Sequence, residues 1–412
     1  MTKIEQKIPE GWSVKKLGEC FQFLKTTSHS RGETQRSGDV HYIHYGDIHT
    51  KYNLHVSPSD IDLFISESQA EKGSLLQNGD LILLDASEDY EGTTKCIELS
   101  NICNEKIIAG LHTLALRDKN KNFSDGFRAY ITSMPWVKSN FWKQVTGIKV
   151  YGISKENLSK LKLLLPPLPE QEKIAGILSC WDDGIEKLSA LIEKKKIQKK
   201  ALMQQLLTGK HRLKGFSTPW HEVRLGDIAI IATGMSKAQY INESGDYFVI
   251  DMGAVSNEAT LIAKKRTSYD EDFLNVNDII MPKDDIGGGN IIGKCIIVSE
   301  NRKYILGDHV FKIVIKNNFP LFICLKINSF EINKYMKRCA TGSAQLGLSK
   351  KDVSKCLLFI PTDLAEQKAI AEILSKADEE IELLNKKLEA FKQEKKALMQ
   401  QLLTGKIRVK VN

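Results

Sequence analysis

The sequence predicts an α+β protein with a pseudo-two-fold internal repeat, in which two similar mixed α/β modules are joined by two long helices that form an antiparallel coiled coil. The strongest evidence is a repeated segment. Eleven residues, KALMQQLLTGK, occupy Lys200–Lys210 and return unchanged as Lys396–Lys406, 196 residues later in a chain of 412. The match continues upstream without a gap to Glu170-Gln171 and Glu366-Gln367. A repeat of this length sets the architecture, so each half is expected to end in the same element.

Each repeated segment has the pattern of a long helix. Its apolar residues step alternately by four and three positions, which is the seam of a coiled coil, and charged residues fill the other faces. About 38 residues at about 1.5 Å per residue give roughly 57 Å of helix. Gly209 and Gly405 stand where a glycine commonly ends a helix. The simplest partner for each seam is the other copy, although Lys195 and Lys199 interrupt the first seam and leave its pairing open there.

Weaker repetition covers the rest of each half and predicts two modules of one fold. Short motifs recur in order at offsets between 195 and 208 residues, while the segments between them differ. We therefore divide the chain into a first module at 1–165, a first helix at 166–210, a second module at 211–361, and a second helix with a C-terminal tail at 362–412. The recurring motifs include Trp12 with Trp220, Asp80 with Asp278, Lys95-Cys96 with Lys294-Cys295, His112 with His309, Thr146-Gly147 with Thr341-Gly342, and Gly152-Ile153-Ser154 with Gly347-Leu348-Ser349.

Composition is that of a globular protein and restricts the function only loosely. Hydrophobic residues make up 42% and charged residues 27% of the chain, and the net charge of +8 suits a polyanionic partner without requiring one. No stretch is long and apolar enough to span a membrane. The eight cysteines form no Cys-x-x-Cys pair and the nine histidines no His-Glu-x-x-His motif, so no metal site is expected. His112 and His309 are interpreted as scaffold or groove-lining residues.

Enzyme motifs are incomplete wherever they begin. Gly288 to Lys294 has the spacing of a phosphate-binding loop, but Cys295 replaces the required Ser or Thr and a strand pattern follows in place of a helix. Pro166-Pro167 lacks the flanking residues of an amino-methyltransferase motif. A metal-dependent nuclease frame from Asp80, Asp85, Glu91 and Lys95 finds no convincing match in the second half, and these acids are better explained as turn residues.

The order of the motifs resembles one known family. The carrying residues are Leu165-Pro-Pro-Leu-Pro-Glu170-Gln171 through Gly209, and Ile360-Pro-Thr-Asp-Leu-Ala-Glu366-Gln367 through Gly405. Each half contains a variable module, then this helix start, then a Leu-Leu-Thr-Gly helix end. This doubled order closely resembles the specificity (S) subunit of type I restriction–modification systems, over essentially the full chain.

The resemblance implies a function without catalysis. Each module would be a target-recognition domain for one half of a split, asymmetric DNA sequence, and the helices would set the spacing of the half-sites. The helices would also dock two modification (methyltransferase) subunits, which bind S-adenosylmethionine, and restriction subunits, which use ATP and Mg²⁺, would join them. This chain itself would hold no cofactor or metal and would act in a prokaryotic cytoplasm, on the nucleoid when assembled.

Candidate DNA contacts are the basic and polar residues of two regions in each module. Matching loops that follow Thr-Gly carry different side chains in the two halves, as expected if they recognise different bases. In the first module the candidates are Arg31, Arg36, His41, Lys51, Lys149, Tyr151 and Lys155. In the second they are Lys264, Lys265, Arg266, Lys337, Arg338, Ser343, Gln345, Lys350 and Lys351.

A rival interpretation remains open at this point. The coiled coil could serve a scaffold protein that binds no specific DNA sequence. The sequence also leaves open the target bases and the length of the gap between half-sites.

Overall fold

The computed structural model describes residues 8–89, 92–147, 150–343 and 345–411. The chain folds into two compact units, one made of residues 1–189 and 386–412 and the other of residues 190–385. Each unit therefore contains one module, the first half of one long helix and the second half of the other. Glu91 of the nuclease frame and Lys149, a candidate DNA contact, lie outside the described residues.

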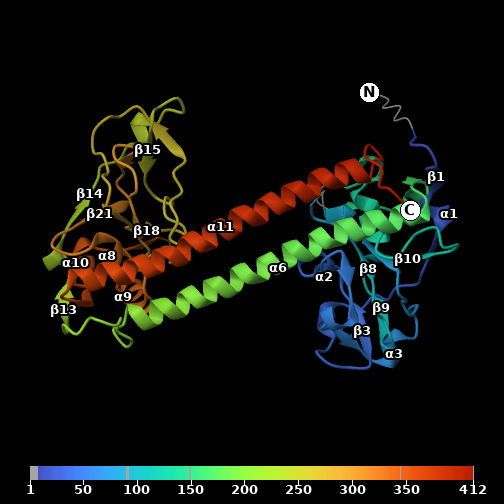
Figure 1. Ribbon diagram of the computed structural model, residues 1–412, viewed down its shortest axis with the longest axis horizontal. Helices are drawn as coiled ribbons and strands as arrows, with labels where there is room; N and C mark the ends of the chain where they lie inside the picture. Colours follow the sequence, from blue (N-terminus) through green and yellow to red (C-terminus); the bar gives the residue numbers. More distant parts are fainter. Residues whose placement is uncertain (1–7, 90–91, 148–149, 344, 412) are drawn as a thin grey trace. The chain divides into compact units, whose positions relative to one another are not determined.

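The first unit contains two main sheets (Figure 1). The larger has the order β2-β10-β6-β8-β4, and the smaller has the order β5-β3-β9 with β3 and β9 parallel. Two strand pairs, β1 with β12 and β7 with β11, complete the module. The strands are β1 Ser13–Lys16, β2 Phe21–Phe23, β3 Val40–Ile43, β4 His55–Val56, β5 Phe64–Ile65, β6 Leu81–Leu84, β7 Ala86–Ser87, β8 Cys96–Leu99, β9 Lys106–Ala109, β10 Thr113–Asp118, β11 Tyr151–Gly152 and β12 Lys162–Leu165. The short helices are α1 Leu17–Cys20, α2 Tyr45–Thr50, α3 Glu67–Ala70, α4 Pro135–Trp142 and α5 Lys155–Ser159.

The second unit repeats this topology except that its larger sheet has no described counterpart of β4. Its larger sheet has the order β14-β21-β17-β19, and its smaller sheet β16-β15-β20 again contains one parallel pair, β15 with β20. The pairs β13 with β23 and β18 with β22 match β1 with β12 and β7 with β11. The strands are β13 Trp220–Arg224, β14 Ala229–Thr233, β15 Tyr247–Ile250, β16 Lys265–Thr267, β17 Ile279–Pro282, β18 Asp284–Asp285, β19 Ile296–Ile297, β20 Tyr304–Leu306, β21 Val310–Ile315, β22 Leu346–Gly347 and β23 Leu357–Pro361. The helices are α7 Leu225–Ile228, α8 Pro320–Ile327, α9 Phe330–Cys339 and α10 Lys350–Lys355.

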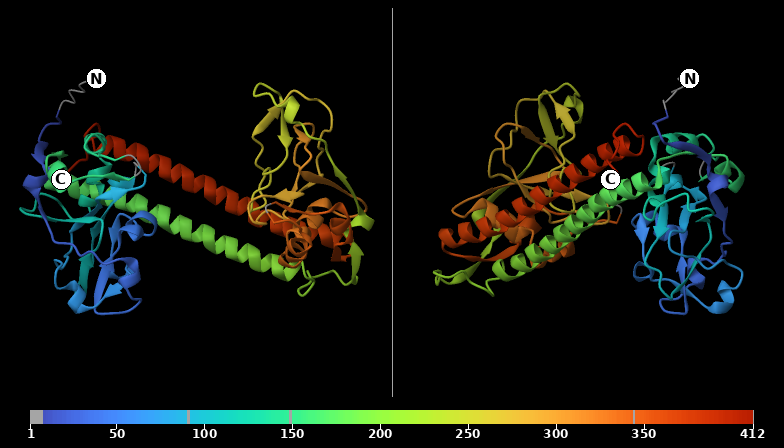
Figure 2. Two further views of the ribbon diagram at one scale, coloured as in Figure 1. Left: turned by 180° about the vertical axis from the view of Figure 1, so that it is seen from behind. Right: turned by 45° about the vertical axis from the view of Figure 1, so that its right-hand side comes forward.

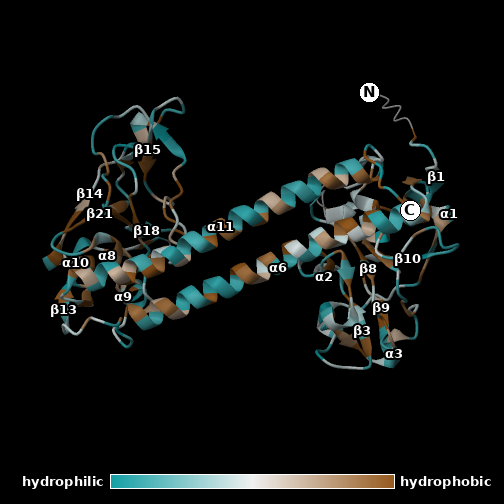
Figure 3. Cartoon of the chain, viewed as in Figure 1, coloured by the Kyte–Doolittle hydropathy of each residue, from teal (hydrophilic) through white to brown (hydrophobic). Residues whose placement is uncertain are grey.

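The central strand of each larger sheet is buried on both faces. In β6, Leu81 and Leu83 pack into one hydrophobic core while Ile82 and Leu84 pack into another. Because successive side chains of a strand point to opposite faces, one short strand joins the two cores. β17 does the same in the second unit, and the brown strands of Figure 3 show this concentration of apolar residues inside each module. The predicted α+β class with an internal repeat is thus confirmed.

The long helices are α6, Leu168–Leu206, and α11, Leu364–Leu402, with 39 residues each. At about 1.5 Å per residue each is roughly 58 Å long. Gly209 and Gly405 follow them with φ of +72° and +69°, the left-handed conformation in which glycine is favoured. The leucines just before these glycines are buried in a module core, Leu206-Leu207 in the second unit and Leu402-Leu403 in the first.

Within each unit, the half-helices run antiparallel (Figures 1 and 2). Ion pairs connect them. In the first unit, Asp182 of α6 pairs with Lys395 of α11 and Trp181 packs edge-on against Phe391 with ring centroids 5.3 Å apart. In the second unit, Lys199 pairs with Asp378, the repeat image of that ion pair, and Lys195 lies 2.6 Å from Glu380. The two lysines that interrupt the seam therefore do pair, through carboxylates of the other helix.

A charge gradient along each helix explains the antiparallel direction. Residues 168–187 of α6 include five acids and two lysines, whereas residues 188–206 include one acid and five lysines. α11 has the same gradient, with six acids and two lysines in 364–383 and two acids and five lysines in 384–402. An antiparallel pair places acidic segments beside basic ones, and a parallel pair would place like charges together.

The Glu-Gln motif at the start of each helix forms a buried clasp. Glu366 is 0% exposed, and its carboxylate accepts two hydrogen bonds from Arg212, at 2.6 and 2.7 Å, and one from the Trp220 indole at 3.3 Å. Glu170 makes the same contacts with Arg408 and Trp12. The C-terminal tail thus takes the place in the first unit that the segment after α6 takes in the second.

The neighbouring glutamines complete the clasp. Gln171 donates to the Pro166 and Asn122 carbonyl oxygens and accepts from the Ser124 amide. Gln367 likewise donates to the Pro361 carbonyl oxygen and accepts from the Phe319 amide. Buried polar groups need such partners, so the motif is explained by the attachment of each helix to its module.

We expect Arg212→Ala to lower the free energy of unfolding by about 3 kcal/mol, because it leaves the buried Glu366 carboxylate without its cation. Arg408→Ala should cost less, because the Arg408 side chain is 41% exposed and that of Arg212 only 27%. Denaturant unfolding followed by tryptophan fluorescence measures both. Wild-type stability of Arg212→Ala would contradict the structural role of the clasp.

Candidate nucleic-acid interface

A short closed loop stands at the same place in each module. In the first unit Thr146 and Gly152 exchange backbone hydrogen bonds of 3.0 and 2.8 Å, and in the second unit Thr341 and Gly347 do the same at the same distances. Gly147 and Gly342 have φ of +134° and +119°, and a Cβ at either would meet a carbonyl oxygen at 1.8 or 2.0 Å. The recurring glycines are therefore required by this turn.

The residues after each loop fix its base. Ser154 and Ser349 cap the following helices, α5 and α10, by accepting the amides of Asn157 and Asp352 at 3.1 Å each. Lys155 and Lys350 are consequently the first helical residues beside each loop. The Gly-x-Ser-Lys motif is thus a scaffold, and the residues between its flanking threonine and glycine are free to differ.

A histidine and an aspartate form a pair beside each closed loop, which we call the loop floor: His112 with Asp85 in the first unit, and His309 with Asp284 in the second. His112 Nδ1 lies 3.3 Å from an Asp85 oxygen, and His309 Nδ1 lies 2.8 Å from an Asp284 oxygen. His112 has a φ of +56° and packs edge-on against Tyr45, with ring centroids 5.5 Å apart. These contacts place both histidines along a partly exposed surface that also contains the loop.

The second unit brings three potential metal ligands together on this floor. Ligand atoms of Asp251, Asp308 and His309 lie within 4.8 Å of one another. Asp251 is already paired with Lys265 at 3.1 Å, and side-chain contacts with Lys265 lower the pKa of Asp251 although burial opposes the shift. These interactions connect β16 with the loop floor.

Comparison with known proteins identifies what these paired modules are. The family described as "Type I restriction modification DNA specificity domain" matches the chain twice, over residues 9–199 and 217–393. The chain belongs to this family.

Individual relatives agree over almost the whole length. The MjaVIII specificity subunit of a type I restriction enzyme from Methanocaldococcus jannaschii is 26% identical, with 98% of this chain and 95% of the relative covered. The fold resembles that of the type I restriction–modification S subunit from M. genitalium, with a TM-score of 0.60, 15% identity, and coverage of 97% of this chain and 98% of that one. A chain from a structure titled for complex assembly and conformational transition of the type I R-M system gives a TM-score of 0.56 at 15% identity, with 97% and 100% covered.

The chain is thus a DNA-specificity subunit of the type I class and is not itself the catalytic subunit. In the described part of the chain, no helix has both the length and the apolarity needed to cross a bilayer.

Two groups of predicted contact residues are found in the first recognition domain of this specificity subunit. Tyr151 lies in β11 and Lys155 begins α5, both at the closed loop. The other group surrounds β3 and β5 and is held by intramolecular contacts. Arg31 pairs with buried Asp47 at 2.6 Å, and Arg36 and Lys51 share the Asp62 carboxylate at 2.9 and 2.8 Å.

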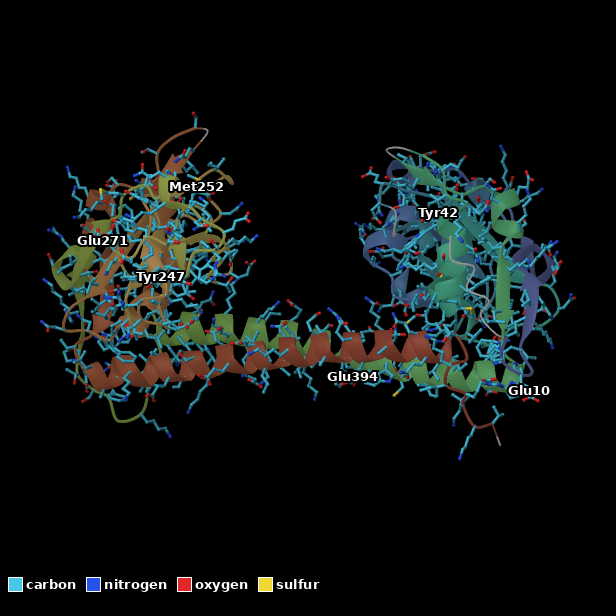
Figure 4. All side chains as sticks on the ribbon, turned by 90° about the horizontal axis from the view of Figure 1, so that it is seen from above. Glu10, Tyr42, Tyr247, Met252, Glu271 and Glu394 are labelled. Atoms are coloured by element: carbon cyan, nitrogen blue, oxygen red, sulfur yellow. The ribbon has the colours of Figure 1, made fainter. Side chains whose placement is uncertain are left out.

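Aromatic residues connect these two groups. His41 packs against Phe64 with ring centroids 4.5 Å apart. The Tyr45 ring centre lies 4.5 Å from that of His44, which follows β3, and 5.5 Å from that of His112. Tyr45 therefore connects the smaller sheet with the histidine that pairs with Asp85. Burial, with Arg31 nearby, lowers the pKa of His44. Tyr42, labelled in Figure 4, is fully buried and donates to the His29 carbonyl oxygen, so it belongs to the scaffold.

The second recognition domain has a similar division. Ser343 and Gln345 are exposed in the closed loop, and Lys350 and Lys351 are exposed at the start of α10. Lys337 and Arg338 are exposed in the last turn of α9. Lys264 precedes β16, where Arg266 donates to the Gly245 carbonyl oxygen and lies over the Phe248 ring.

The apparent catalytic motifs have structural explanations. The segment Gly288 to Lys294 is followed by β19 and not by a helix, as the strand pattern predicted. Asp80 accepts the Gln77 amide and pairs with Arg117, and Asp278 accepts the Asn275 amide and pairs with Lys312. Both acids therefore close turns, and each neutralises a cation.

The sequence did not single out Asp285. This residue is 4% exposed, and its carboxylate accepts the amides of Gly287 and Ile291. The available sequence pattern was an acid two residues before the first of three consecutive glycines, which is typical of a side chain that anchors a loop.

We expect the double substitution Lys350→Ala with Lys351→Ala to weaken DNA binding of the assembled complex with little effect on its preferred sequence. Neither lysine has an ion-pair partner among the described residues. Log affinity falls as log salt concentration rises, and loss of two phosphate contacts should make this slope less steep by about 1.8. Fluorescence anisotropy across a salt series measures this slope. Lys392→Ala, which removes a cation paired with Glu389 on α11, is the control and should leave it unchanged. An unchanged slope in the double variant would exclude these lysines from the interface.

Proposed function

We propose that each recognition domain binds one half of a bipartite, asymmetric DNA target, and that the paired helices set the distance between the half-sites. The observation that supports this most strongly is the contrast between the two halves. Scaffold residues recur, including Thr146 with Thr341 and Ser154 with Ser349, while the residues inside the loops differ. One fold that presents two sets of side chains suits the recognition of two different sequences.

The two closed loops offer different chemistry to base edges. The first ends with Val150 and Tyr151, an apolar and an aromatic residue, whereas the second carries Ser343 and Gln345. A glutamine can bond in a bidentate manner to adenine in the major groove, and apolar groups contact the thymine methyl. Lysines at the helix starts beside both loops suit phosphate contacts, which position a protein without specifying sequence.

The identical helix ends support docking of two copies of the same partner. Leu206 and Leu207 are explained by burial in a module core. Burial does not explain why exposed residues are also identical. The repeated helix ends share an exposed face, which consists of Lys200, Ala201, Gln204 and Gln205 in α6, and Lys396, Ala397, Gln400 and Gln401 in α11. We infer that each face binds one modification (methyltransferase) subunit.

The remaining components belong to those partners. Modification subunits would supply S-adenosylmethionine, and restriction subunits would join them with ATP and Mg²⁺ in the prokaryotic cytoplasm, where the target DNA lies. This chain would position them and hold no cofactor of its own.

Adding one heptad of seven residues to both helices, after Ala190 and after Lys386, tests the spacing role. These positions match in the two copies, so the seam keeps its phase. Each helix lengthens by about 10.5 Å, and we expect both half-sites to stay the same while the gap grows by about three base pairs of 3.4 Å. Sequencing of adenine methylation in cells that express the variant with its modification subunit measures both.

A methylated sequence with altered half-sites would contradict the proposed division of labour. Methylation without sequence preference by the wild-type complex would instead support the scaffold interpretation.

A further inference from the structure

A loop rich in glycine lies beside the closed loop of the second unit. It runs from Ile286 to Gly293 and connects β18 with β19. β18 pairs with β22, with Asp285 opposite Leu346, and a Cβ at Gly289 would lie 3.0 Å from the Leu346 side chain. The loop is therefore in contact with the segment that carries Ser343 and Gln345.

Asp285 fixes the shape of this loop. Its two carboxylate oxygens accept the Gly287 amide at 2.5 Å and the Ile291 amide at 3.0 Å, so one buried side chain spans the loop. Within it, Asn290 donates to the Gly287 carbonyl oxygen at 2.6 Å. At the far end, Asn333 of α9 donates to the Ile292 carbonyl oxygen at 2.9 Å. Hydrogen bonds therefore fix the loop near both of its ends.

The first residue of the loop exposes an apolar side chain. Ile286 is 65% exposed, next to Gly287 and Gly288, which are exposed and have no side chains to obstruct an approaching surface. An exposed isoleucine on a rigid loop is costly in water and is suited to an apolar contact such as the thymine methyl in the major groove.

The first unit offers a matched comparison. Tyr151 pairs with Ser87 as Leu346 pairs with Asp285, so Ser87 occupies the equivalent position. Within the described residues, Ser87 accepts the Asp89 amide at 3.2 Å, and the following residues are the acids Glu88 and Asp89. At these paired positions, the second unit has a buried carboxylate that accepts two amides and an exposed isoleucine after it, whereas the first unit has a serine followed by acids.

We propose that Asp285 is a positioning residue that holds the loop Ile286–Gly293 against DNA as a second recognition element of the second domain, with Ile286 as the side chain that discriminates a base pair. This rests on the proposed function, because it assumes that the second domain recognises one half-site. Asp285 itself is buried and acts only through the loop.

The test is methylation of a DNA library, randomised in both half-sites, by the complete complex of specificity and modification subunits. Ile286→Ala changes an exposed side chain and should leave folding intact. It should reduce discrimination at one base pair of one half-site by about tenfold, as a single lost contact does. Asp285→Ala should relax the same position and its neighbours, and Asp285→Asn, which keeps an acceptor oxygen, should retain more of the wild-type preference.

Two controls make the outcome decisive. Ser87→Ala, at the equivalent position, should leave the affected half-site unchanged, and so should Ile230→Ala, which removes a 50% exposed apolar side chain from β14. Wild-type selectivity in both Ile286→Ala and Asp285→Ala would overturn the inference while leaving the bipartite function standing. A wild-type complex without a two-part target would overturn the proposed function itself.

Discussion

The buried carboxylate at the start of each long helix is the constraint on which the architecture depends. Glu170 and Glu366 are almost completely removed from water, which is unfavourable unless a cation and further donors surround them. Arg408 with Trp12, and Arg212 with Trp220, supply those groups from segments far away in the sequence. The start of each helix is therefore bonded both to a module and to a second segment of the chain. The same requirement, fulfilled twice, gives the chain its internal symmetry.

Two different causes preserve the repeated helix sequence. The Leu-Leu pairs end in the hydrophobic cores, and the charge gradients direct the antiparallel pairing, so these positions are maintained by folding. The exposed Lys-Ala and Gln-Gln positions have no such role within the described chain, and the proposed binding of an identical partner would account for their identity. In the modules, by contrast, the recurring residues have structural roles and the differing residues lie inside the closed loops. The recurring glycines and serines shape the closed loops, and in the proposed function the residues that differ between them carry the difference in recognition.

Sequence patterns were sufficient where the cause was local or repeated. The heptad seam, the glycines after the helices and the doubled plan followed from spacing alone. Contacts between distant residues were not accessible in this way. Lys195 and Lys199 looked like interruptions of the seam until Glu380 and Asp378 were found beside them. Arg36 and Lys51 looked like free cations, but both bind Asp62. The sequence did not single out Asp285, because its bonds to Gly287 and Ile291 depend on how the loop closes.

The central claim is that two copies of one fold recognise two unlike half-sites through their own loops. The most direct measurement is the methylation target of a chain that carries the second recognition domain, residues 211–361, in place of both domains, with the helices unchanged. With two identical recognition domains related by a two-fold axis, its complex with modification subunits should methylate an inverted repeat of a single half-site. A target that keeps the original asymmetry would contradict the account, because it would show that specificity resides outside the modules.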